Sequence, residues 1–162
     1  MSKIKVALDF CLSMRLVGAL DHLYGDSGYE FMHLSKLVPN TSSDQVWADA
    51  YRRFGGRIVI SGDPRIAYRP HQALAFQANG LVSFFPEGNW GQLRGPEKSA
   101  FIIYWWPAIE VKAKSAANGT CWRIPCNSKK GDLRLASGDL VPLVVPNEVL
   151  KRAAGNKRSS AV

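Results

Sequence analysis

An unbroken run of β-branched residues, Ile58-Val59-Ile60, most constrains what this chain can fold into. Such a run is typical of a strand that other elements cover on both faces, because neither face is polar. Gly55-Gly56 end a helix pattern before the run, and Ser61-Gly62 break the strand after it. We therefore expect Asp63 just past the carboxyl end of a buried strand, where open α/β sheets bind their ligands.

Strand and helix patterns alternate along the first 114 residues. Strands are expected at 4–8, 29–34, 58–60 and 81–85, and helices at 12–24, 44–54, 70–78 and 96–114, with Pro107 kinking or dividing the last helix. This alternation predicts an α/β fold in three layers, with a central parallel sheet of the Rossmann-like kind. Residues 1–114 should form this domain. Residues 115–162 should form a C-terminal extension, packed on the same domain, with short paired strands at 122–124 and 133–135 and a frayed basic end.

The charge and the composition limit the classes of protein to which this chain can belong. The formal net charge is +8, and residues 101–162 alone carry 10 Lys/Arg against 4 Asp/Glu. A basic surface beside an acidic pocket suits a polyanionic substrate, although a solubilising tail explains the charge equally well. No apolar run approaches the roughly 20 residues of a membrane span. The strand-like start and the three cysteines, an odd number, favour a cytoplasmic protein without a signal peptide.

Three aspartates fall at element ends that a parallel fold would bring together. Asp9 ends the first strand, Asp44 opens a helix and Asp63 follows the central strand. Mg²⁺ and Mn²⁺ prefer oxygen ligands, and three gathered carboxylates would repel one another strongly without a cation. The pattern therefore predicts a divalent metal site. Taken singly, Asp44 could be a helix-capping charge and Asp63 a turn residue.

Several neighbouring side chains could support this chemistry. Ser61 could donate a hydrogen bond to one of the acids, or it could only end the strand. Arg65 and Arg69 could bind a phosphate, although solvated arginines are the commoner case. Trp47 and Trp90 are expected to pack in the core and not to stack on bases.

The ordered set of Asp9, Asp44 and Ser61-Gly62-Asp63 resembles the PIN-like nuclease domains, and most closely their VapC-type toxin branch. That branch has a strand-end Asp, a helix-opening Asp before a Trp or similar residue, and a Thr/Ser-x-Asp after the third strand. The resemblance covers roughly residues 4–114. It implies a Mg²⁺- or Mn²⁺-dependent ribonuclease of a toxin-antitoxin pair. By position, Asp9, Asp44 and Asp63 would be catalytic metal ligands, with Ser61 supporting them.

The chain departs from this family pattern at one acid. Most PIN nucleases carry a fourth acid between the first two, and here Glu30 lies in an expected strand while Glu87 would approach by another route. The departure leaves open a catalytically weak scaffold that binds RNA or a protein. A strand-end aspartyl phosphatase would need an acid where Cys11 stands. We therefore expect metal-assisted hydrolysis of RNA, with an antitoxin and a second copy of the chain as protein partners.

Overall fold

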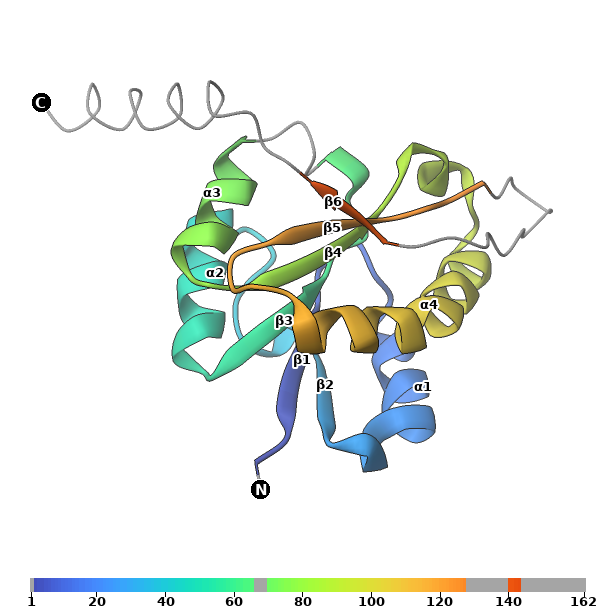
Figure 1. Ribbon diagram of the computed structural model, residues 1–162, viewed down its shortest axis with the longest axis horizontal. Helices are drawn as coiled ribbons and strands as arrows, with labels where there is room; N and C mark the ends of the chain where they lie inside the picture. Colours follow the sequence, from blue (N-terminus) through green and yellow to red (C-terminus); the bar gives the residue numbers. More distant parts are fainter. Residues whose placement is uncertain (1, 66–69, 128–139, 144–162) are drawn as a thin grey trace, which may run out of the picture.

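Six strands form one sheet, in the order β2-β1-β3-β4-β5-β6, in the computed structural model, which describes residues 2–65, 70–127 and 140–143 (Figure 1). The strands are β1 (Ile4–Leu8), β2 (Tyr29–His33), β3 (Gly56–Ile60), β4 (Val82–Pro86), β5 (Cys121–Ile124) and β6 (Val141–Leu143). The first five pair in parallel, and β6 pairs antiparallel with β5. The predicted α/β fold with a parallel sheet is confirmed.

Helices cover both faces of this sheet (Figure 1). The helices are α1 (Met14–Tyr24), α2 (Asp44–Arg53), α3 (Pro70–Ala78) and α4 (Gly95–Ser115), joined in places by the short 3₁₀ turns η1 (Gly25–Ser27), η2 (Leu34–Lys36) and η4 (Gly88–Gln92). Helices α1 and α4 pack on one face, and α2 and α3 pack on the other. No helix in the described part of the chain is both long enough and apolar enough to cross a bilayer.

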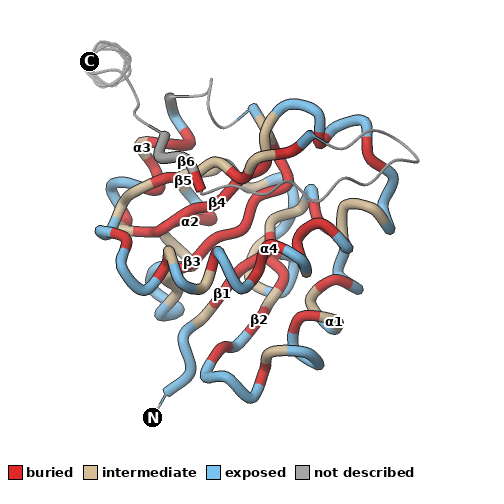
Figure 2. Tube along the Cα trace, turned by 45° about the vertical axis from the view of Figure 1, so that its right-hand side comes forward, coloured by how far each residue is buried: buried red, intermediate tan, exposed pale blue. Residues whose placement is uncertain are grey.

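The two faces of the sheet have separate cores, because side chains alternate along each strand. Val6 and Leu8 of β1 belong to the core under α1 and α4, whereas Ala7 belongs to the core under α2 and α3. In the first core, Trp106 packs edge-on against Phe31, with ring centroids 4.8 Å apart. In the second, Trp47 packs on Phe76. Figure 2 shows the strands buried in the middle of the molecule, as two-sided covering requires.

Element ends differ from the predicted ones where side chains cap them. Helix α1 starts at Met14 because the Ser13 side chain accepts a hydrogen bond from the Arg15 N–H at 3.2 Å. Pro107 lies inside α4 without dividing it. Pro107 is exposed, so its ring lies on the solvent side of the helix.

The predicted boundary at residue 114 lies one residue before the end of α4 (Gly95–Ser115). Strand β5, which contains the expected strand 122–124, pairs with β4 of the main sheet. Its expected partner at 133–135 lies outside the described residues, as does the basic end of the chain. Strand β6 takes the neighbouring position instead.

Tyr51 of α2 fastens the helix to the sheet at the start of β3. Its ring is fully buried, and its hydroxyl lies 2.9 Å from the Lys5 carbonyl oxygen and 2.7 Å from that of Ile58. The ring lies against Gly56, where an added Cβ would collide with it. Glycine is therefore required at this position, because any side chain there would collide with the Tyr51 ring.

We expect Gly56→Ala to lower the free energy of unfolding by about 1–3 kcal/mol, because the new methyl group displaces the buried Tyr51 ring. Urea unfolding of the purified protein measures the change. Gly91→Ala is the matched control, since an added Cβ there meets no atom within 4 Å, and it should change the stability by less than about 0.5 kcal/mol. Equal stability of the two variants would contradict this packing.

Candidate active site

The candidate site lies at the carboxyl ends of β1 and β3. From β1 the chain passes through α1 to β2 on one side, and β3 lies on the other side of β1. Two neighbouring strands whose connections leave in opposite directions open a crevice between their carboxyl ends, and this crevice is where α/β folds bind ligands. Asp9 follows β1 and Asp63 follows β3, so both acids lie at this crevice.

The Asp9 carboxylate joins the ends of the two strands. Its Oδ1 accepts hydrogen bonds from the N–H groups of Cys11 and Gly62, each at 3.0 Å. Its Oδ2 accepts a short hydrogen bond from the Ser61 hydroxyl. Burial raises the pKa of Asp9; these three hydrogen bonds oppose the rise, and the negative charge of Asp63 adds to it. The carboxylate is therefore fixed in position but poorly solvated.

Asp63 is buried and is held by Arg65. Its Oδ1 accepts from the Arg65 backbone N–H and Nε, both at 2.9 Å, and its Oδ2 accepts from an Arg65 terminal nitrogen at 3.2 Å. The Arg65 side chain is 63% exposed. Its guanidinium can therefore move to another anion without disturbing the core, although it neutralises Asp63 in this structure.

Asp44 is the first residue of α2, and Ser43, which precedes it, is the N-cap. The Asp44 Oδ1 accepts hydrogen bonds from the Trp47 indole N–H and the Gln72 amide, each at 3.1 Å. Asp44 is therefore not the capping residue, and the structure directs its carboxylate toward groups of α2 and α3. Trp47 and Trp90 are both buried, as predicted.

All three acids line one pocket of about 160 Å³. Asp9 and Asp63 come from the sheet edge, while Asp44 comes from α2 and Gln72 from α3. Cys11 lines the same pocket, and partial burial together with the charges of Asp9 and Asp63 raises its pKa to about 11. The thiol therefore stays protonated near neutral pH and is a poor nucleophile.

The donors of this pocket fit a hydrated divalent ion better than a fully caged one. Within residues 2–65, 70–127 and 140–143, no group of three His, Cys, Asp or Glu side chains is close enough to hold a metal. Mg²⁺ commonly takes only one or two carboxylates and keeps water and phosphate as its other ligands. The negative charge of Asp63 contributes to the raised pKa of Asp9. A cation beside the two carboxylates would relieve this repulsion between them.

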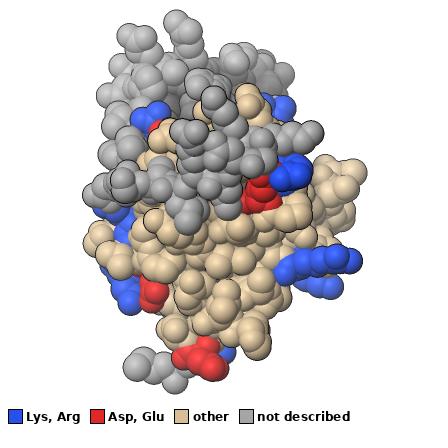
Figure 3. Space-filling view, turned by 90° about the vertical axis from the view of Figure 1, so that its right-hand side faces the viewer, with Lys and Arg blue, Asp and Glu red and all other residues tan. Residues whose placement is uncertain are grey.

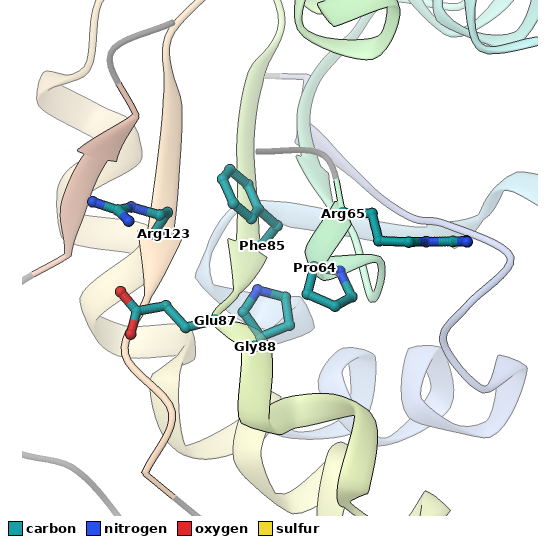
Figure 4. A pocket seen from close by; sticks show the side chains of 7 residues that line it. Pro64, Arg65, Phe85, Glu87, Gly88 and Arg123 are labelled. Atoms are coloured by element: carbon teal, nitrogen blue, oxygen red, sulfur yellow. The ribbon is translucent and has the colours of Figure 1, made fainter. Parts of the chain in front are cut away.

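The two candidates for a fourth acid lie elsewhere. Glu30 pairs with Lys5 at 3.0 Å and stands opposite it in the β1–β2 register. Lys5 is four residues from Asp9, about 13 Å along the strand. Glu87 lines a separate pocket, shown in Figure 4. Neither glutamate lines the pocket of the three aspartates.

Of the two roles that the sequence left open for Ser61, the structure shows the hydrogen bond to an acid, and it shows a second contact as well. Its hydroxyl donates to Asp9, and its oxygen accepts from the Asp63 N–H at 3.0 Å. Arg65 contacts Asp63, whereas Arg69 lies outside the described residues.

Two supporting contacts were not predicted from the sequence. Gln72 binds Asp44, and the buried Trp90 donates its indole N–H to the Gly62 carbonyl at 3.0 Å. Each contact joins residues 28 positions apart, so no local sequence pattern predicts it.

We expect Asp9→Asn to raise the free energy of unfolding at pH 7, measured in EDTA, because burial makes the charged carboxylate unfavourable in the folded state. The amide keeps an oxygen for the Cys11 and Gly62 N–H groups but removes the poorly solvated charge. Because burial raises the pKa of Asp9 in the folded state, the stability of the wild type falls as the pH rises from the unfolded-state pKa through the folded-state pKa. The difference between the two proteins should vanish below both values.

Urea unfolding at several pH values between 3 and 8 measures this difference. Asp26→Asn, which changes an exposed carboxylate of η1, is the control and should alter the stability little. An Asp9→Asn protein that is less stable than the wild type at pH 7 and equally stable at pH 3 would show that the charge itself stabilises the site.

Comparison with known proteins identifies the family. Residues 4–88, slightly more than half of the chain, match the family described as PIN like domain. Neither the curated proteins nor the solved structures include a match. The matched region runs from β1 to the turn after β4 and contains Asp9, Asp44, Ser61 and Asp63. The chain therefore belongs to the PIN-like domain family.

Proposed function

We propose that this PIN-like domain is a ribonuclease that uses Mg²⁺ or Mn²⁺ to hydrolyse phosphodiester bonds. The observation that carries the proposal is that Asp9, Asp44 and Asp63 line one pocket at the carboxyl edge of the parallel sheet. Three acids from distant parts of a chain have little structural reason to converge on one open pocket. A role in metal-assisted phosphoryl chemistry would explain why the three acids converge there.

Each residue of the pocket has a separate role in this proposal, which follows from its environment. A bound divalent ion, held by Asp9 and Asp63, would neutralise charge on the scissile phosphate. Ser61 and the Gly62 N–H keep the Asp9 carboxylate in a single orientation. Arg65 leaves Asp63 and binds a phosphate oxygen, a pairing that guanidinium geometry favours. Asp44, held by Trp47 and Gln72, accepts a proton from the attacking water.

We also place the protein in the VapC-type toxin branch, acting in the cytoplasm on RNA and controlled by an antitoxin protein. The order and residue types of the three acids support this placement. A homodimer is part of the proposal, since Tyr104 and Val111 lie seven residues apart on α4 and are 47% and 69% exposed. Figure 3 shows an uncharged surface between groups of Lys and Arg, which would suit contact with another protein.

A catalytically weak scaffold that binds RNA or a protein partner is the second candidate. It is favoured by the lack of a three-ligand metal group in the described ranges and by the Arg65 guanidinium on Asp63. Such a protein would keep the pocket but would not cleave its ligand.

We expect the wild type to cleave a fluorescently labelled single-stranded RNA in Mn²⁺, and Asp9→Asn and Asp44→Asn each to lower the rate at least about 100-fold. Denaturing gel electrophoresis measures the cleavage. Asp26→Asn, in η1 at the opposite edge of the sheet, is the matched control and should cleave like the wild type.

Metal binding is tested separately by thermal unfolding. Mn²⁺ should raise the melting temperature of the wild type more than that of Asp9→Asn, because an ion that binds only the folded state stabilises it. RNA binding without cleavage, together with no metal-linked shift in either protein, would favour the scaffold and contradict the nuclease.

A further inference from the structure

A second and larger pocket opens on the same edge of the sheet, with a volume of about 360 Å³ (Figure 4). Small-molecule sites commonly measure about 300–1,000 Å³. Its lining comes from three neighbouring strand ends. Pro64 and Arg65 follow β3, Pro86 ends β4 and Glu87 follows it, and Arg123 belongs to β5.

This pocket borders the pocket of the three aspartates. Pro64 and Arg65 follow Asp63 directly in sequence, and Arg65 lines the larger pocket while its guanidinium binds Asp63. Adjacent strands lie about 4.8 Å apart, so the two pockets are separated by about one or two strand spacings. A single polynucleotide strand can therefore occupy both at once.

The walls of the larger pocket suit a flat ring with a polar edge. Figure 4 shows Glu87 and Arg123 on one side of the pocket, Pro64 and Arg65 on the other, and Phe85 between them. The proline rings offer apolar contact to a ring face. On the opposite side, Glu87 supplies hydrogen-bond acceptors, and the Arg123 Nε–H is buried with no hydrogen-bond partner.

We propose that this pocket binds a guanine nucleotide of the RNA, next to the nucleotide whose phosphate reaches the aspartates. The assignment of the ligand to RNA rests on the proposed ribonuclease function. Guanine presents two neighbouring N–H donors, N1–H and the N2 amino group, beside its O6 acceptor. A carboxylate accepts two such donors together, and an arginine donates to O6.

The other bases fit this pair of side chains less well. Adenine and cytosine each present one amino donor next to a ring acceptor, and uracil presents one ring N–H between two acceptors. Each would leave one Glu87 oxygen without a partner or place an acceptor against it. A site that is built to bind two donors discriminates against bases that lack one of them, because a desolvated acceptor then stays unpaired.

Titration of the full chain with GMP, AMP, CMP and UMP in EDTA tests the proposal by calorimetry, without any need for catalysis. GMP should bind at least about 10-fold more tightly than the other three nucleotides. Glu87→Gln should remove this preference, because a glutamine offers one acceptor in place of two. Arg123→Ala should weaken GMP binding. Glu30→Gln and Arg53→Ala, which change exposed residues away from the pocket, should leave the ranking unchanged.

Equal binding of the four nucleotides, no binding of any, or an unchanged ranking in Glu87→Gln would overturn the proposal. If that variant does not fold, the ranking by the wild type decides alone. RNA cleavage without GMP preference would refute the guanine pocket and leave the ribonuclease standing. GMP preference that depends on Glu87, in a protein that cleaves no RNA, would support the pocket and refute the ribonuclease.

Discussion

The hydrogen bonds that the Asp9 carboxylate accepts hold the candidate site together. Three donors, two of them from the loop after β3 and one from the loop after β1, converge on a single side chain. These hydrogen bonds join the two loops in one relative position, and partial burial leaves the carboxylate poorly solvated. The same burial that fixes the carboxylate also makes its charge unfavourable. A rigid anion that is short of solvation is well suited to receive a cation.

The fold supplies this arrangement through its topology. Parallel strands carry their following loops to one edge of the sheet, so Asp9 and Asp63, which follow the paired strands β1 and β3, line the same pocket. Trp90 secures the loop from the β4 side by its bond to the Gly62 carbonyl. Arg65 stands between the acidic pocket and the larger one. If a ligand in the larger pocket draws the Arg65 guanidinium away from Asp63, the pocket of the three aspartates becomes more negative.

Periodicity and turn residues carried enough information to predict the elements up to α4, because each depends on a local pattern. The Ser61–Asp9 contact was predictable for a related reason, since both residues end neighbouring parallel strands. The contacts of Gln72 with Asp44 and of Trp90 with Gly62 were not, because they depend on how distant elements pack. The sequence left open whether Pro107 kinks or divides α4, and the structure shows that the helix continues through this residue. The larger pocket, built from three strand ends, has no sequence signature.

A crystal of the full chain soaked in Mn²⁺, with anomalous diffraction recorded at the manganese edge, tests the central claim most directly. We predict one strong anomalous peak within bonding distance of carboxylate oxygens of both Asp9 and Asp63, with the Arg65 guanidinium moved away from Asp63. An absence of anomalous density in this pocket, with the Arg65–Asp63 ion pair intact at high Mn²⁺ concentration, would contradict it.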